Sequence, residues 1–316
     1  MPEHVNKVSI IGAGAVGATI AYAAMIRGVA KHFVLYDINR AKVDAEVLDL
    51  NHGLQFMPMA TLVGSDDLAA CANSDVVVIT AGAKQQPGQT RLELAGANVE
   101  LCRKLVPALM KVAPDALLLV VTNPVDVVTY VVQQLSGLPA RRVFGSGTVL
   151  DSSRLRFLVA RHLNLAVQNV HAFVAGEHGD SELALWSSAT VGGQPLLNWS
   201  VPGRPALTEA DRTRIFDDVR NAAYHIIRGK GATNYAIGLA TAQILEAVLH
   251  HEQRVLPVSS RLEGYLGIDD VCMSVPSIVN RGGVEAVLEL PVNDAEAQGL
   301  RHSADTIRKT IRALGF

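Results

Sequence analysis

Cysteine is scarce in this chain of 316 residues, which has only Cys71, Cys102 and Cys272. The three are an odd number, lie far apart and lack the CxxC spacing of a metal or redox pair. They therefore indicate neither a disulfide framework nor a cysteine metal site. We expect the protein to work in the reducing cytoplasm and to bind no metal.

An excess of one charge is also lacking, because 28 basic and 30 acidic residues leave a formal net charge of -2. These charges are spread along the chain, which gives no electrostatic footprint for nucleic acid. One charge-free apolar run, residues 8–26, is long enough to span a bilayer. Its glycines have a better explanation in a dinucleotide-binding turn and no cleavage site follows, so we expect no membrane partner either.

The remaining composition, 49% hydrophobic and 18% charged, predicts a globular protein with room for two domains. Short β-branched runs recur in the first half with helix-like stretches between most of them, which predicts a parallel sheet covered on both faces. The pattern changes near Ser146. We therefore predict a Rossmann-type, doubly wound α/β domain over residues 1–146, with strands at 8–11, 33–36, 76–80, 117–121 and 142–145.

The second half mixes long helices with strands that glycines interrupt, which predicts an α+β substrate-binding domain over residues 147–316. The final helix is expected to begin near a capping residue, Asn293. The other predicted elements are helices at 151–162 and 208–228, a strand at 170–174 and twisted hairpins within 255–290.

A glycine-rich turn follows the first predicted strand, with Gly12, Gly14 and Gly17 in a GxGxxG pattern that runs into an Ala-rich helix. Such glycines let the backbone approach a pyrophosphate, whose charge the helix N-terminus meets. Asp37 ends the second predicted strand, where a carboxylate can accept hydrogen bonds from both ribose hydroxyls and would repel a 2′-phosphate. The pattern favours NAD over NADP, with a glycine-rich packing turn and a flavin site as alternatives.

A candidate catalytic histidine, His178, stands between glycines directly after an apolar predicted strand. Loops at strand ends are where sites are built, although a lone histidine in this setting is more often a core residue. Asp151 and Arg154 are three residues apart on a predicted helix, so they share a face and can address one pocket, whereas Arg156 points elsewhere.

Seven motifs together resemble the lactate/malate dehydrogenase family, in its bacterial lactate-type branch, over nearly the whole chain. Jointly they are highly specific. The motifs are Gly12-Ala-Gly-Ala-Val-Gly17, Thr80-Ala-Gly-Ala83, Pro87-Gly-Gln-Thr-Arg91, Thr122-Asn-Pro-Val-Asp126, Leu150-Asp-Ser-Ser-Arg154, Gly176-Glu-His-Gly-Asp180 and Lys230-Gly-Ala-Thr233.

The resemblance implies an NAD-dependent oxidoreductase that reversibly reduces pyruvate to L-lactate. His178 matches the residue that gives a proton to the substrate C2 oxygen as hydride reaches C2, and an imidazole pKa of about 6.5 suits both directions. Asp151 matches the carboxylate that orients the ring. Arg154 matches the arginine that grips the substrate carboxylate, for which a planar guanidinium is suited. Arg91 matches the arginine that polarises the reacting carbonyl; a surface position is the ordinary alternative for either arginine.

Further cofactor contacts are implied by the same resemblance. Asn123 matches an asparagine that hydrogen-bonds near the nicotinamide and the reacting oxygen. The other residues implied to contact the cofactor are Val16, Ala81, Gly82 and Val121.

The choice of acid depends on Gln85, because a dicarboxylate such as oxaloacetate needs a cation facing its second carboxylate. The resemblance implies arginine at this position in malate enzymes and neutral glutamine in lactate enzymes. Asp180 and Thr233 also match the lactate pattern, and the Asp180 charge disfavours a second carboxylate. Gln89 departs from the glutamate more usual there. A lactate-like malate dehydrogenase and a non-catalytic NAD-binding protein remain the alternatives.

Regulation and assembly are suggested only by the resemblance. Arg156 and His171 match positions where bacterial relatives bind fructose 1,6-bisphosphate across a subunit interface, and both residue types suit a phosphate. Whether this effector acts on the chain is left open. The resemblance implies a homotetramer, or dimers that form tetramers with the effector.

Overall fold

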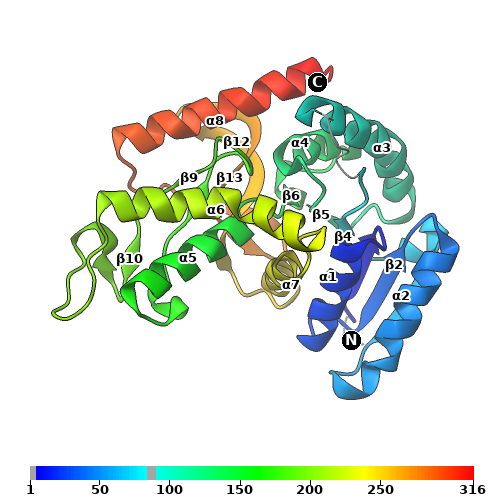
Figure 1. Ribbon diagram of the computed structural model, residues 1–316. Coiled ribbons are helices and arrows are strands. Elements are labelled where there is room, and N and C mark those ends of the chain that lie inside the picture. Colours follow the sequence, from blue (N-terminus) through cyan, green and yellow to red (C-terminus); the bar gives the residue numbers. More distant parts are fainter. Residues whose placement is uncertain (1–4, 84–89) are drawn as a thin grey trace.

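The computed structural model describes residues 5–83 and 90–316 (Figure 1). Gln85 and the motif residues 87–89, which include Gln89, lie outside the described residues. Within the described ranges, no helix is long and apolar enough to cross a membrane.

A parallel sheet forms the first half of the chain, as predicted. Its strands lie in the spatial order β3-β2-β1-β4-β5-β6. In β4, Val76 and Val78 face one core cluster, whereas Val77 and Ile79 face another. The sheet is therefore buried on both faces, which explains its uninterrupted apolar strands. The strands are β1 (Lys7–Ile11), β2 (His32–Tyr36), β3 (Thr61–Ser65), β4 (Val76–Ile79), β5 (Leu117–Val120) and β6 (Val143–Gly145).

Helices cover the two faces of this sheet in separate groups. One core cluster contains buried residues of α1, α2 and α7, and the other contains those of α3 and α4. Helix α7 comes from the second half of the chain and lies beside α1, where Asn234 donates to the Thr19 hydroxyl at 3.0 Å. The helices are α1 (Ala15–Ile26), α2 (Arg40–His52), α3 (Arg91–Val112), α4 (Val125–Ser136) and α7 (Tyr235–Leu249).

The predicted hairpins extend the same sheet. Strands β12 (Arg254–Tyr265), β13 (Ile268–Asn280) and β14 (Gly283–Val287) are antiparallel, and Ser259 of β12 pairs with Gly145 of β6. Gly264 and Gly267 have positive φ at the β12–β13 turn, a backbone conformation that favours glycine. One nine-stranded sheet therefore runs through both halves of the chain.

The predicted strand at 170–174 is wrong as a single element. It is divided into β7 (Val170–His171) and β8 (Val174–Ala175), because the two pieces pair with β10 and β9 in separate small sheets. This part of the chain also contains β9 (Leu183–Ala184), β10 (Thr190–Val191) and β11 (Gln194–Pro195).

The long helices of the second half surround these short strands (Figure 1). They are α5 (Val149–Leu163), α6 (Glu209–Lys230) and α8 (Asp294–Ala313). Asn293 caps α8, as predicted, and the structure adds a capping box with Glu296. Such a cap contributes about 0.5–2 kcal/mol. The apolar face of α8 is buried against β13, which brings Ser303 toward the interior.

Candidate active site

The turn between β1 and α1 has the geometry of a dinucleotide-binding loop. Gly12 has a φ of +108°, and a Cβ there would lie 2.8 Å from the Thr80 hydroxyl. A Cβ on Gly17 would lie 1.9 Å from the Gly12 carbonyl oxygen. Gly14 faces open space, with the Lys42 ammonium 4.0 Å away. Two glycines therefore let the turn close, and the third leaves its outer side free for a phosphate.

A cavity of about 610 Å³ opens beside this turn. Lys42 lies on its wall near Gly14, where its charge would neutralise a pyrophosphate. Sequence reasoning missed Lys42 because it resembles any exposed lysine on a helix. The described lining residues are Ile11, Gly12, Gly14, Tyr36, Asp37, Ile38, Lys42, Leu68, Thr80, Ala81, Gly82, Ala83, Ala97, Leu101, Lys104 and Leu105.

Four other predicted cofactor residues are outside this lining. Gly17 is buried within the turn, and Val16 packs against the core beneath α1. Val121 is buried beyond the end of β5, and Asn123 is exposed two residues later. Their predicted contacts with a cofactor stay predictions.

Asp37 lies on the cavity wall at the carboxyl end of β2. One of its oxygens accepts a hydrogen bond from the Ala13 amide at 2.8 Å, and the other accepts from the Asn39 amide at 3.0 Å. These bonds fix the carboxylate beside the glycine turn. Because each carboxylate oxygen has a second lone pair, Asp37 can still accept from two ribose hydroxyls. The residues present therefore fit NAD.

A buried asparagine, Asn98 of α3, joins two strand ends at the cavity. Its side chain accepts from the Ala83 amide at 2.7 Å and donates to the Asn123 carbonyl at 2.6 Å. Gly82 is required nearby, because a Cβ there would lie 2.6 Å from the Thr122 methyl group. Asn98 was not selected from the sequence, since its partners are distant along the chain.

The His178 loop is held at three backbone positions. Gly176 has a φ of +97°, and a Cβ there would lie 2.8 Å from the Ser303 hydroxyl. The Glu177 amide donates to that hydroxyl at 2.6 Å, and the His178 amide donates to Asp126 at 2.7 Å. Burial raises the pKa of Asp126 to about 6. Asp126 and Ser303 therefore position the His178 loop, a role that the sequence did not indicate for either residue.

Asp151 connects the predicted catalytic histidine to the predicted substrate-binding arginine. One carboxylate oxygen contacts His178 Nδ1 at 2.6 Å, and the other accepts from Arg154 at 2.5 Å. Only 2% of the Asp151 side chain is exposed, against 28% for His178. The sequence spacing placed Asp151 and Arg154 on one face of α5, but it did not predict their ion pair.

This arrangement favours a charged pair of His178 and Asp151. Burial alone would lower the pKa of His178, but the charge and hydrogen bond of Asp151 raise it to about 9. Burial alone would likewise raise the pKa of Asp151, but the cations of His178 and Arg154 hold it below its ordinary value. Since Nδ1 faces Asp151, Nε2 is the ring nitrogen left to exchange a proton with a substrate.

The remaining predicted substrate residues are less defined. Thr233 lies half-buried between α6 and α7. Arg91 opens α3, but its side chain and Gln85 lie outside the described residues. A contact of any of the three with substrate therefore stays a prediction.

The predicted effector residues lie on neighbouring segments. Arg156 of α5 donates from Nε to the Ala172 carbonyl at 2.8 Å and lies over the Phe173 ring at 4.9 Å. His171, adjacent to Ala172, is exposed on β7. Burial lowers the pKa of Arg156 from its ordinary value.

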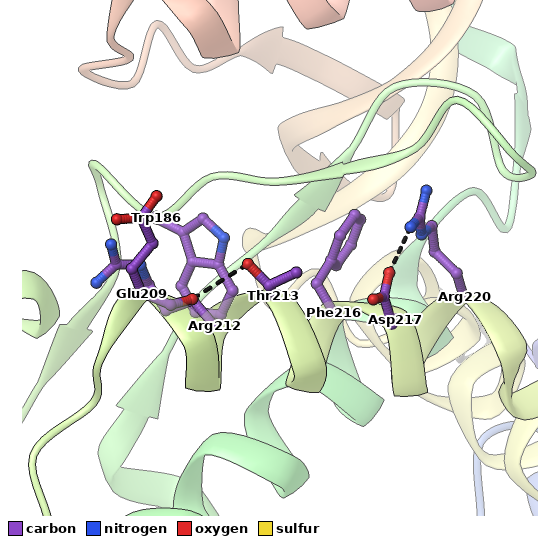
Figure 2. A pocket seen from close by; sticks show the side chains of 7 residues that line it. All are labelled: Trp186, Glu209, Arg212, Thr213, Phe216, Asp217 and Arg220. Atoms are coloured by element: carbon purple, nitrogen blue, oxygen red, sulfur yellow. Dashed lines mark hydrogen bonds and ion pairs between the residues drawn. The ribbon is translucent and has the colours of Figure 1, made fainter.

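A second cavity, of about 350 Å³, follows α6 (Figure 2). Asp217 and Arg220 form an ion pair at one end of it, at 2.5 Å, and Trp186 lies at the other. None of the residues selected from the sequence lines this cavity among the described residues.

A glycine turn beside a cavity, a carboxylate on the wall of that cavity and a buried histidine–aspartate pair beside an arginine are together typical of a nicotinamide-dependent dehydrogenase for acid substrates. Comparison with known proteins narrows this class. Residues 6–145 match the lactate/malate dehydrogenase NAD binding domain, and residues 148–314 match the alpha/beta C-terminal domain of the same enzymes. The chain belongs to the lactate/malate dehydrogenase family, and its N-terminal part is an NAD-binding domain.

Individual relatives resemble the chain over nearly their whole length. It is 53% identical to the L-lactate dehydrogenase of Bifidobacterium animalis subsp. lactis, covering 100% of this chain and 99% of the relative. It is 47% identical to that of Acetivibrio thermocellus, with 98% of each chain covered. Among solved structures, a lactate dehydrogenase from a Medee basin deep-sea metagenome library has a TM-score of 0.95 at 38% identity, covering 99% of this chain and 100% of the other. The minor L-lactate dehydrogenase from Enterococcus mundtii has a TM-score of 0.91 at 40% identity, with 98% of each covered.

Proposed function

We propose that this protein is an NAD-dependent L-lactate dehydrogenase, which reversibly reduces pyruvate to L-lactate. One observation carries the proposal: Asp151 holds a proton-bearing imidazole and a guanidinium on its two carboxylate oxygens. This pair can supply a proton and a carboxylate-binding cation to the same small acid. The names of the full-length relatives support the same reaction.

Bound NADH supplies the hydride that reduces C2 of the substrate. Arg154 binds the substrate carboxylate through donors that Asp151 does not occupy. His178 gives its Nε2 proton to the C2 oxygen, and Asp151 stabilises the imidazolium before that transfer. In lactate oxidation the neutral ring takes the hydroxyl proton. We assign carbonyl polarisation to Arg91, and further contacts to Asn123 and Thr233, from the family motifs alone.

Exchanging Gln85 for arginine tests the choice of acid. In Gln85→Arg, the ratio of oxaloacetate to pyruvate reduction should rise by more than about tenfold, because a cation without a carboxylate partner is costly beside a methyl group. NADH absorbance with each acid measures the ratio, and wild type should prefer pyruvate. An unchanged ratio would mean that Gln85 does not face the substrate. A wild type that reduces neither acid would overturn the proposed function.

Allosteric activation by fructose 1,6-bisphosphate is a finer part of the proposal. Arg156 and His171 support it, because the Arg156 guanidinium is held by the carbonyl of Ala172, the residue that follows the exposed His171 in the chain. Adding fructose 1,6-bisphosphate should lower the half-saturating pyruvate concentration by about tenfold, in the usual range of allosteric coupling. His171→Ala should reduce the effect. A pyruvate saturation curve that does not respond to the effector would exclude this activation.

We also propose that the protein is a homo-oligomer, with the tetramer as the active form. Exposed apolar side chains on neighbouring helices support an interface, since 51% of Tyr22 on α1 is exposed, and 71% of Tyr235 and 53% of Leu239 on α7. Sedimentation velocity during the same effector titration should give a tetramer, or a shift from dimer to tetramer. A monomer under both conditions would contradict this assembly.

A further inference from the structure

A second acidic residue, Glu182, lies beside the histidine–aspartate pair. It belongs to the loop that carries His178, where its amide donates to the Gly179 carbonyl at 3.3 Å. Only 6% of the residue is exposed, which is rare for a glutamate. Nothing in its sequence position distinguishes it from an ordinary loop charge, and the reaction proposed above does not use it.

The Glu182 carboxylate lies close to the pair of His178 and Asp151 without a hydrogen bond to either residue. A carboxylate oxygen of Asp151, a ring nitrogen of His178 and a carboxylate oxygen of Glu182 all lie within 4.8 Å of one another. The Glu182 carboxylate takes part in no hydrogen bond within the part of the chain that the structure describes. It therefore acts on His178 through its charge alone, whereas Asp151 acts through charge and a hydrogen bond.

Charged groups from three other elements face this cluster. Asp151 and Arg154 come from α5, Asp126 faces His178 from α4, and Arg220 comes from α6. Arg220 is already paired with Asp217 at the end of the second cavity (Figure 2), which weakens its influence on Glu182. His178 is therefore the main partner that can favour an ionised Glu182.

The protonation states of Glu182 and His178 are consequently coupled. Burial, followed by the charge of Asp151, raises the pKa of Glu182 to about 8, while a protonated His178 opposes this rise. An ionised Glu182 in turn raises the pKa of His178. A proton on the imidazole favours the Glu182 carboxylate, and loss of that proton favours the neutral acid.

We propose that Glu182 is a positioning residue for the proton of the reaction: near the pH at which His178 titrates, where Glu182 is ionised, it is a second carboxylate that holds the proton on His178 until the substrate oxygen accepts it. When His178 loses its proton at such a pH, Glu182 takes one up from solvent, and it gives that proton back when His178 is protonated again. The buried cluster thereby avoids an uncompensated negative charge. The expected effect on kcat/KM for pyruvate rests on the proposed function.

The test compares Glu182→Gln, which removes the charge with little change in shape, with wild type. The pH at which kcat/KM for pyruvate falls by half should decrease by about one unit, with less than about a threefold change near pH 6, where His178 is protonated in both. The control is Glu263→Gln, the same loss of charge at an exposed position on β12. That control should leave the midpoint unchanged, and Glu182→Asp should keep most of the wild-type value.

A second measurement does not depend on turnover. NMR titration of the His178 ring Cε1, assigned by its loss in His178→Asn, should show two steps in wild type and a single, lower step in Glu182→Gln. If wild type has one step, or if Glu182→Gln and the control variant move the midpoint of kcat/KM equally, the proposal is overturned. A loss of activity in Glu182→Gln that is equal at every pH would indicate a structural role and also overturn it. If wild type has no dehydrogenase activity but shows the two steps, only the proposed function fails.

Discussion

Replacing His178 with asparagine should reduce kcat/KM for pyruvate at neutral pH by about 10²- to 10⁴-fold, the usual contribution of a positioned general acid. Asparagine is smaller than histidine and cannot carry a proton to the substrate oxygen. Arg154 and the glycine turn are unaffected, so NADH affinity should stay within about threefold of wild type. Stopped-flow reduction of pyruvate and NADH fluorescence titration measure the two quantities.

The wild-type pH profile should identify the same residue. His178 has a pKa raised to about 9 by Asp151 against the effect of burial, so the imidazolium is present below that pH and is lost above it. Pyruvate reduction needs the imidazolium and should fall as pH rises through about 9, whereas lactate oxidation needs the neutral ring and should rise. The asparagine variant should lose this titration. A flat wild-type profile would remove His178 from the proton-transfer role.

Local sequence patterns predicted those features that depend on neighbours along the chain. Five of the six parallel strands followed from short apolar runs, whereas β3 was not predicted. The α8 cap followed from Asn293, and the shared face of Asp151 and Arg154 from helical spacing. Each of these rests on hydrogen bonds or packing within one segment. The predicted strand at 170–174 failed because its pairing partners, β9 and β10, determine where each short strand begins and ends.

Features that need distant segments could not be predicted as contacts. Asp126 and Ser303 hold the His178 loop from α4 and α8, and their side chains offer no local signal for that role. Lys42 and Glu182 resemble surface charges until the fold brings one beside Gly14 and buries the other beside His178. Family motifs compensated for this limit only where the resemblance also implied a role, as for His178, whereas Asp126 stands in a motif but was assigned no role.

Replacing Arg154, which is paired with Asp151, is the second change for which we expect a large effect. Arg154→Lys should raise the KM for pyruvate by about 10- to 100-fold, because losing one of two parallel charge-assisted hydrogen bonds costs about 1.5–3 kcal/mol. A lysine in this position can still pair with Asp151, but it presents a point charge in place of a planar pair of donors. The fold and the pKa of His178 should therefore change little, which separates this effect from that of a damaged site.

Steady-state kinetics with pyruvate and its neutral amide would test that explanation. If Arg154 grips the carboxylate, the preference of wild type for pyruvate over pyruvamide should shrink in Arg154→Lys, since the amide never used the second donor. Arg161→Lys, at an exposed position in the last turn of the same helix, is the matched control and should behave as wild type. An equal loss on both substrates would mean that Arg154 acts by holding Asp151, and hence His178, in place rather than by binding the substrate carboxylate.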